Sequence, residues 1–229
     1  MTTLVVTILP SVIIFCYFFF SDKFKEPKRI IAEVFLLGIV ATIPAGYLNN
    51  FILKNFENGD LFNDALLTGF FAGGLVEEIL KFSILYFFVL KKNEFNEPMD
   101  GIVYGVVASL GFATLENIEY VYFHADKYGV TSLSMAYSRA FSAVPLHGLA
   151  GVVMGFYFGL YSFFGDRKYI GYALVMPLLF HGSYNFLLSF NGIYAFGILV
   201  ILLVYALKLH KYIKLKQSEK IVETEIKKI

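Results

Sequence analysis

Long apolar runs constrain this chain most, because each is able to cross a lipid bilayer as a helix. A spanning helix needs about 20 largely apolar residues, since its backbone polar groups must be satisfied internally in lipid. Seven such runs lie at about residues 4–20, 30–53, 65–90, 99–123, 136–163, 169–190 and 192–209. Hydrophobic residues make up 58% of the chain and charged residues 16%, whereas soluble domains have about 45–50% and about 25%. We therefore predict an all-α, polytopic membrane helix bundle with about seven transmembrane helices.

The distribution of basic residues predicts how this bundle is oriented. Lys and Arg accumulate in cytoplasmic loops. Fifteen of the 19 basic residues lie after odd-numbered helices or in the C-terminal tail, and the opposite loops carry only Lys54 and Lys127. We expect the N-terminus outside and the C-terminus in the cytoplasm. Residues 1–209 would form the transmembrane domain, and residues 210–229 a charged, solvated cytoplasmic tail.

Two rows of small residues at four-residue spacing predict where helices pack closely. Small side chains let two helix backbones approach each other in a membrane. The rows are Gly101, Gly105 and Ser109 in one helix and Gly151, Gly155 and Gly159 in another. We interpret both rows as packing surfaces rather than as chemistry.

Charge and cysteine content exclude some classes of protein. The formal net charge of +1 gives no generally basic surface for nucleic acid, so we expect no nucleic-acid partner. The single cysteine, Cys16, cannot form an intrachain disulfide, and no C-x2-C zinc spacing is present.

Two adjacent glutamates occupy the middle of the predicted helix 65–90. Each ionisable residue near the centre of a spanning helix costs about 2.5–3.5 kcal/mol on insertion scales. Glu77 and Lys81 are four residues apart with the acid first, which favours an ion pair. Glu77 and Glu78 point about 100° apart around the helix, so one of them can be structural and the other catalytic. A purely structural interpretation pairs Glu77 with Lys81 and Glu78 with Arg139.

Further polar residues are expected at similar depth on three other helices. They are Glu116 and Asn117 in 99–123, Arg139 and His147 in 136–163, and His181 and Asn185 in 169–190. Pro145 removes a backbone hydrogen bond and predicts a kink beside His147. We expect the other two histidines, His124 and His210, to be solvated.

Peptide hydrolysis is one chemistry that this set can support. An ionised glutamate, Glu77 or Glu78, can act as general base on water. His181 and Asn185, four residues apart on one helix face, can donate hydrogen bonds to an oxyanion. His147 can orient the water or protonate the leaving amine. Alternatively, Glu78, His147 and His181 can bind zinc and polarise water. The residues alone leave these mechanisms open.

Other functions fit the same residues. The buried Glu and His side chains can form the proton relay of a coupled transporter or channel, or they can serve helix pairing in a scaffold without catalysis. Among proteolytic routes, no H-E-x-x-H helix, no mid-span aspartate pair and no G-x-S-x-G elbow is present.

Four ordered sequence blocks resemble the PrsW family of bacterial membrane proteases, in the wider group with the CAAX-prenyl endopeptidases and bacteriocin-processing proteins. The blocks are Glu77-Glu78-x-x-Lys81, Asp100-Gly-Ile-Val-Tyr-Gly continuing to Gly111-Phe-Ala-Thr-Leu-Glu-Asn117, His147 with Gly151 and Met154-Gly-Phe-Tyr157, and His181-Gly-Ser-Tyr-Asn185. Asn185 departs from the pattern, since Asp is expected there in close relatives. An amide donates a hydrogen bond that a carboxylate does not, which fits an oxyanion role better than a zinc ligand.

The resemblance implies a glutamate-based intramembrane protease in the bacterial cell membrane. Its implied substrate is a single-span anti-sigma factor, whose first cut leads to release of an extracytoplasmic-function sigma factor. Glu77, Glu78 and His181 are implied to be essential, with Glu116 and His147 lining the site. No cofactor is expected, although zinc is compatible with the residues.

Overall fold

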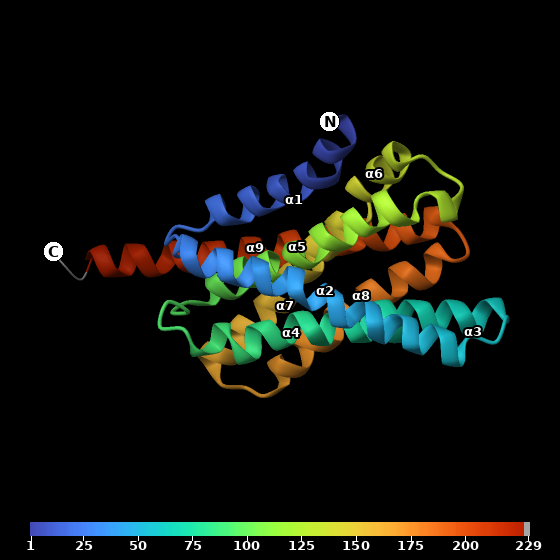
Figure 1. The fold of residues 1–229 in the computed structure, drawn as a ribbon. Helices are drawn as coiled ribbons and strands as arrows, with labels where there is room; N and C mark the ends of the chain where they lie inside the picture. Colours follow the sequence, from blue (N-terminus) through green and yellow to red (C-terminus); the bar gives the residue numbers. More distant parts are fainter. Residues whose placement is uncertain (227–229) are drawn as a thin grey trace.

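The computed structural model describes residues 1–226 of the chain, with side chains described through Glu219. Every regular element in this part of the chain is a helix (Figure 1). The elements are α1 Thr2–Ser21, α2 Lys28–Phe56, α3 Leu61–Leu66, η1 Leu67–Val76, α4 Glu77–Phe87, η2 Val89–Lys91, α5 Pro98–Glu119, η3 Tyr120–His124, η4 Asp126–Tyr128, α6 Ser132–Ala140, α7 Ala143–Phe164, α8 Lys168–Leu188 and α9 Gly192–Ile226. The polytopic helical fold is therefore confirmed.

Five helical segments of the described chain are long and apolar enough to cross a membrane. They are Thr2–Ser21, Lys28–Phe56, Pro98–His124, Ser132–Phe164 and Gly192–Glu219. The two remaining predicted spans correspond to Leu61–Phe87 and to α8, which carry buried polar residues that lower their hydropathy. The count of seven spans and the orientation stay predictions.

Helices α5 and α7 form the centre of the bundle, and their small residues explain why they pack so closely. A Cβ added at Gly105 or Gly155 would overlap the backbone of the opposite helix, and one at Gly151 would lie 2.7 Å from Ser109 Oγ. The predicted packing role of both rows is confirmed. Because α5 is buried along most of its length, it provides a fixed frame for polar residues at both of its ends.

The predicted helix 136–163 begins earlier and is broken. The chain forms α6, turns at Phe141 and Ser142, and restarts as α7. Pro145 is the third residue of α7, where a backbone N–H has no partner within the helix. The expected kink at Pro145 is thus wrong, because a proline in the first turn interrupts no hydrogen bond.

A π-helical stretch precedes the two glutamates. The predicted helix 65–90 starts at Leu61, widens into η1 over Leu67–Val76 and continues as α4 from Glu77. π-Helical turns are rare in proteins, and those that occur are often found at functional sites. Glycines let η1 lie against α8, since a Cβ at Gly69 would be 2.7 Å from the Phe186 nitrogen and 2.8 Å from the Gly182 oxygen.

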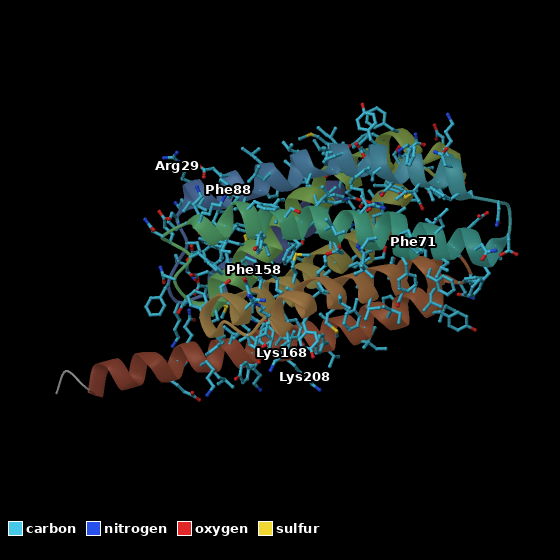
Figure 2. All side chains as sticks on the ribbon, turned by 90° about the horizontal axis from the view of Figure 1, so that it is seen from below. Arg29, Phe71, Phe88, Phe158, Lys168 and Lys208 are labelled. Atoms are coloured by element: carbon cyan, nitrogen blue, oxygen red, sulfur yellow. The ribbon has the colours of Figure 1, made fainter. Side chains whose placement is uncertain are left out.

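The loops rich in basic residues gather at one end of the bundle. The connections α1–α2, α4–α5 and α7–α8 lie toward the end that the C-terminal part of α9 also passes, whereas the other three connections lie at the opposite end (Figure 1). Arg29 and Phe88 mark the first end in a second view, and Phe71 lies toward the other (Figure 2). This arrangement agrees with the alternation used to predict the orientation.

The predicted tail does not begin at a break in structure. Helix α9 continues through position 210 to Ile226, and residues 227–229 lie outside the described residues. His124 is exposed, as expected. His210 is instead buried and hydrogen-bonded to Ser21 Oγ at 2.7 Å, so its predicted solvation is wrong. Ile213 and Gln217 are also buried, because the start of the tail packs against the bundle.

Candidate active site

Five helices bring together the central cluster, which we define as Glu77, Glu78, Lys81, Glu116, Arg139, His147 and His181. The first three come from α4, and the others from α5, α6, α7 and α8 in turn. Glu78 and Lys81 have fully buried side chains, and the Glu77 side chain is 5% exposed. All seven residues were predicted from the sequence, and the tertiary structure joins them into one network.

Glu78 and Lys81 form the innermost pair of this network. The Lys81 ammonium donates to Glu78 Oε1 at 2.8 Å and lies 3.5 Å from Glu77 Oε2. It also lies over the Phe112 ring, 4.4 Å from the centroid. Glu78 Oε1 additionally contacts His181 Nδ1 at 2.8 Å. The Glu77–Lys81 ion pair predicted from the four-residue spacing is therefore present, but Lys81 lies closer to Glu78, which the spacing did not predict.

A second series of hydrogen bonds connects Lys81 to His147 and His147 to Glu116. Lys81 Nζ lies 2.8 Å from His147 Nδ1, and His147 Nε2 lies 3.0 Å from Glu116 Oε2. An ammonium only donates, so Nδ1 accepts and the Nε2–H of His147 donates to Glu116. This order fixes the tautomer of the ring.

Arg139 closes the chain on Glu116, not on Glu78. Its Nη2 donates to Glu116 Oε2 at 2.6 Å, and its Nε donates to Asn117 Oδ1 at 2.8 Å. Asn117 in turn donates to the carbonyl of Thr7 on α1 at 2.7 Å. The expected Arg139–Glu78 pair is wrong. Glu78 contacts Lys81 of α4 and His181 of α8, whereas Arg139 on α6 reaches the carboxylate of Glu116.

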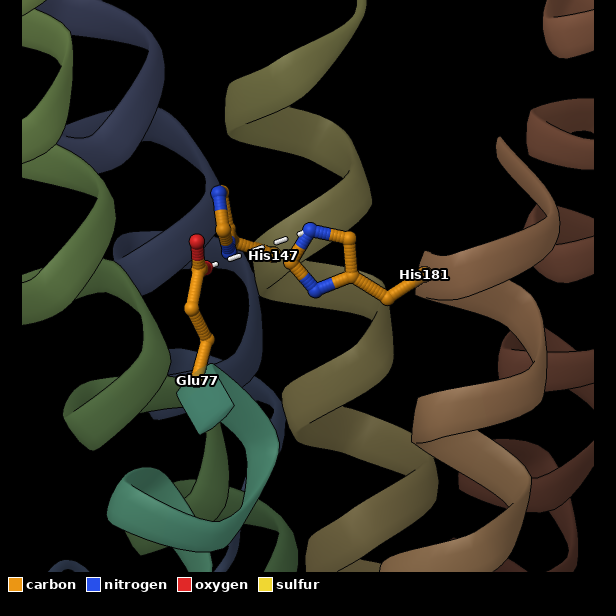
Figure 3. A group of neighbouring side chains, drawn as sticks. All are labelled: Glu77, His147 and His181. Atoms are coloured by element: carbon orange, nitrogen blue, oxygen red, sulfur yellow. Dashed lines mark ion pairs between the residues drawn. The ribbon is translucent and has the colours of Figure 1, made fainter. Parts of the chain in front are cut away.

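Glu77 differs from Glu78 in facing a cavity of about 560 Å³. The wall of this cavity includes Glu77, Glu116, Arg139, His147, His181 and Asn185. Glu77 Oε2 is buried, has no hydrogen-bond donor among the described residues and lies 3.9 Å from His181 Nε2 (Figure 3). His181 Nδ1 faces the Glu78 carboxylate and donates to it, so in the neutral ring Nε2 is an acceptor. With the ring neutral, two acceptors face each other at the cavity wall.

Two amides complete the polar wall. Asn185 lies one turn beyond His181 on α8, and a Cβ added at Gly73 would overlap its side-chain nitrogen, so η1 approaches it through a glycine. Asn49 on α2 donates to Glu77 Oε1 at 3.4 Å. Sequence reasoning missed Asn49, although an amide inside the predicted span 30–53 was the available signal. It also missed Tyr120, whose ring lies 4.0 Å from the Arg139 guanidinium carbon.

Three of these residues form a group suited to a metal ion. One ligand atom each from Glu77, His147 and His181 lies within 4.8 Å of the others, and all three are buried (Figure 3). The sequence prediction had Glu78 as the carboxylate of this set. The structure puts Glu77 there instead, because Glu78 is engaged by Lys81 and His181.

Fold and site together define a polytopic helical membrane protein with a buried carboxylate–histidine site facing a cavity. Residues 26–209 match the family described as PrsW family intramembrane metalloprotease. The chain belongs to this PrsW family, and membership supports a peptidase. It favours the protease over the proton-coupled transporter that the buried residues alone would permit.

Curated relatives named Protease PrsW agree with this assignment. The chain is 38% identical to that of Bacillus subtilis (strain 168) over 186 residues, covering 80% of each chain. It is 35% identical to that of Geobacillus kaustophilus (strain HTA426), covering 79% of this chain and 77% of the relative. The match to that of Clostridioides difficile (strain 630) is 32% identical and covers 87% and 83%. No solved structure matched the chain.

The family description implies a metal, and the donor set fits one. Two histidines and a glutamate are a known catalytic zinc set. Glu77 Oε2 and His181 Nε2 have open lone pairs, and Glu78 accepts from the second nitrogen of His181 as carboxylates do beside metal-bound imidazoles. His147 would first exchange its hydrogen bond with Lys81 or Glu116.

Proposed function

We propose that this protein is a site-1 intramembrane protease of the bacterial cell membrane. Its substrate is a single-span, membrane-anchored anti-sigma factor, and the cut leads to release of an extracytoplasmic-function sigma factor. Family membership supports the reaction class. One observation carries the assignment of the site: Glu77 Oε2, which accepts no hydrogen bond and has only a 3.5 Å ion pair with Lys81, faces His181 Nε2 at the wall of a polar cavity.

In the proposed mechanism Glu77 is the general base. Its free oxygen takes a proton from a water molecule in the cavity while that water attacks the peptide carbonyl. Glu78 is a positioning residue that holds the Lys81 ammonium and the His181 ring. Fixing both groups before the reaction avoids the cost of reorganising them in the transition state.

Asn185 and the His147–Glu116 pair have separate proposed roles. The Asn185 amide makes no hydrogen bond within the described residues and faces the cavity, so it can donate to the oxygen that becomes negative. His147 donates to Glu116, which is held by Arg139. These hydrogen bonds keep the proton of His147 Nε2 near the leaving amine.

A divalent ion such as zinc would be held by Glu77, His147 and His181, and Glu77 would then act as a metal ligand and not as the general base. When bound, it would supply Lewis-acid polarisation of the scissile carbonyl and make water more acidic. The remaining residues keep the positions described above, with Glu78 orienting His181 from behind.

The direct test is cleavage of a single-span anti-sigma factor by purified protein in proteoliposomes. We expect cleavage by wild type, and retained cleavage by the control Glu119→Gln, which changes an acid of α5 outside the cavity lining. Glu77→Gln should insert and accumulate normally but cut at most marginally. Equal cleavage by Glu77→Gln would refute the proposed base. Loss of activity after exhaustive chelation, restored by zinc, supports the metal; activity that survives chelation excludes it.

A further inference from the structure

A second group of buried carboxylates lies far from the cavity. We define the end cluster as Asp22, Glu26 and Asp100, one oxygen of each lying within 4.8 Å of the others. Asp22 and Glu26 are in the turn between α1 and α2, and Asp100 is in the first turn of α5. Glu116 lies 16 residues further along α5, about 24 Å at 1.5 Å per residue. None of the three residues lines the cavity.

The contacts of the end cluster come mainly from neutral donors. Asp22 Oδ1 accepts from the Phe24 backbone at 3.1 Å and from Gln217 Nε2 at 2.7 Å. Asp100 Oδ2 accepts from the backbone N–H groups of Asn96 and Glu97, just before α5, at 2.8 and 2.9 Å. The Tyr104 hydroxyl donates to Glu26 Oε2. These contacts orient the carboxylates without neutralising them.

Two oxygens of the cluster are left without any donor. Asp22 Oδ2 and Asp100 Oδ1 are buried and receive no hydrogen bond from an amide, hydroxyl or cationic donor among the described residues; Asp22 is 3% exposed and Asp100 is 0% exposed. The Asp100 and Glu26 carboxyl groups lie close enough to share a hydrogen bond, which requires a proton on one of them. Asp100 belongs to the capping box of α5, but this role uses only Oδ2. Buried polar atoms are rarely left unpaired, because desolvation is then uncompensated. The cluster therefore needs either protons or a positively charged partner.

Nearby basic side chains do not supply it. Within the described residues no Lys, Arg or His forms an ion pair with Asp22, Glu26 or Asp100. Of the two lysines in this turn, Lys23 is exposed, and Lys25 donates to the backbone carbonyls of Phe19 and Asp22 and lies 5.6 Å from the Phe19 ring centroid. Three carboxylates at this spacing and burial need a positive charge, or protons, to coexist.

We propose that the end cluster is a binding site for a hard divalent cation, Mg²⁺ or Ca²⁺. Its donors are all oxygens, the ligands that these ions prefer, and it offers no thiol or imidazole to a softer metal. The cation would tie the α1–α2 turn to the start of α5, and through Gln217 to α9. Segments distant in sequence would thus be joined at the end where the basic loops gather.

Terbium luminescence on the full-length protein tests this proposal. Tb³⁺ prefers oxygen ligands and is excited through aromatic side chains; the chain has 16 tyrosines and no tryptophan, and Tyr104 touches Glu26. We expect Tb³⁺ binding that Mg²⁺ or Ca²⁺ displaces and Zn²⁺ does not. The double variant Asp22→Asn/Glu26→Gln should weaken binding by at least the about 10–100-fold known for lost metal-site partners.

Two control variants separate this site from others. Glu77→Gln removes the catalytic carboxylate and should keep Tb³⁺ binding. Glu33→Gln removes a partly exposed acid, paired with Arg29 and Lys92 at the same end, and should also keep it. Unchanged binding in the double variant, or loss of binding in Glu77→Gln alone, would overturn the proposal. Failure here leaves the proposed protease activity untouched, since peptide cleavage is measured separately.

Thermal unfolding provides a second readout. If a cation occupies the end cluster, Mg²⁺ or Ca²⁺ raises the unfolding temperature of wild type but not that of Asp22→Asn/Glu26→Gln. If the carboxylates are instead neutralised by protons, the cations leave wild type unchanged and the double variant unfolds at the same or a higher temperature. That second result would also overturn the proposal.

Discussion

The central cluster and the end cluster, which lie at opposite parts of α5, differ in the groups that surround their buried carboxylates. In the central cluster, Glu78 meets Lys81 at 2.8 Å and Glu116 meets Arg139 at 2.6 Å. In the end cluster, three carboxylates meet amides and a hydroxyl but no cationic side chain among the described residues. The protein thus carries its own counter-charges in the central cluster and not in the end cluster.

This difference shows what each region is suited to do. A site with built-in cations can leave one carboxylate, Glu77, open toward a cavity while its neighbours stay neutralised. A site without cations keeps its open oxygens for a charge from outside. Removing one partner of a buried pair is costly, so variants of the central cluster should separate catalytic from structural acids.

The largest expected effect distinguishes Glu77 from Glu78. Glu77→Gln should lower the cleavage rate about 10²–10⁴-fold, the usual contribution of a general base. It should cost less stability than Glu78→Gln, because Lys81 Nζ lies 3.5 Å from Glu77 Oε2 but 2.8 Å from Glu78 Oε1. Glu78→Gln should reduce both activity and stability, because Lys81 loses its closest charge partner. Rates and unfolding curves of both purified variants measure this. Equal stability losses would remove the distinction.

Lys81→Met should destabilise the protein by about 3–5 kcal/mol, because Glu78 is left as an uncompensated buried charge. The double variant Glu78→Gln/Lys81→Met should recover most of that loss without recovering activity. Lys92→Met is the matched control. Its partner Glu33 is 3.5 Å away and both side chains are partly exposed, so the cost should stay below about 1 kcal/mol. Denaturant unfolding in micelles measures all three, and a similar cost for both lysines would contradict the buried pairing.

Asn185→Ala should slow cleavage about 10²–10³-fold, the usual cost of losing one oxyanion donor. Asn185→Asp should slow it comparably, since it replaces a donor with an acceptor of the same size. Ser183→Ala, on the same helix but outside the cavity lining, is the control and should retain activity. Full activity in Asn185→Asp would exclude the oxyanion role.

The smallest expected effect concerns the packing that connects both clusters. Gly155→Ala forces a methyl group into the α5 backbone at Gly101 and should cost about 1–3 kcal/mol by overpacking. Gly197→Ala on α9 has no atom within 4 Å of the added Cβ and should be neutral or stabilising through helix propensity. Unfolding temperatures compare the two directly. A neutral Gly155→Ala would show that α5 and α7 can separate without loss.

The fold class and the residues of the central cluster could be predicted from the sequence. Apolar runs of spanning length leave few alternatives to helices, and ionisable residues within them are conspicuous. Asn49 and the end cluster were harder to find. Asp22 and Glu26 lie in a polar turn, where acids are ordinary, and only their contact with Asp100 makes them unusual.

The sequence by itself thus determined the helical membrane fold, the small-residue contact between two helices and the identities of the polar residues in the core. The tertiary structure alone decided which charges meet. It paired Arg139 with Glu116, turned Glu78 inward and left Glu77 facing the cavity. The reason is geometric: spacing along one helix predicts contacts within that helix, whereas pairs between helices depend on breaks, π turns and glycine contacts that set where neighbouring helices lie.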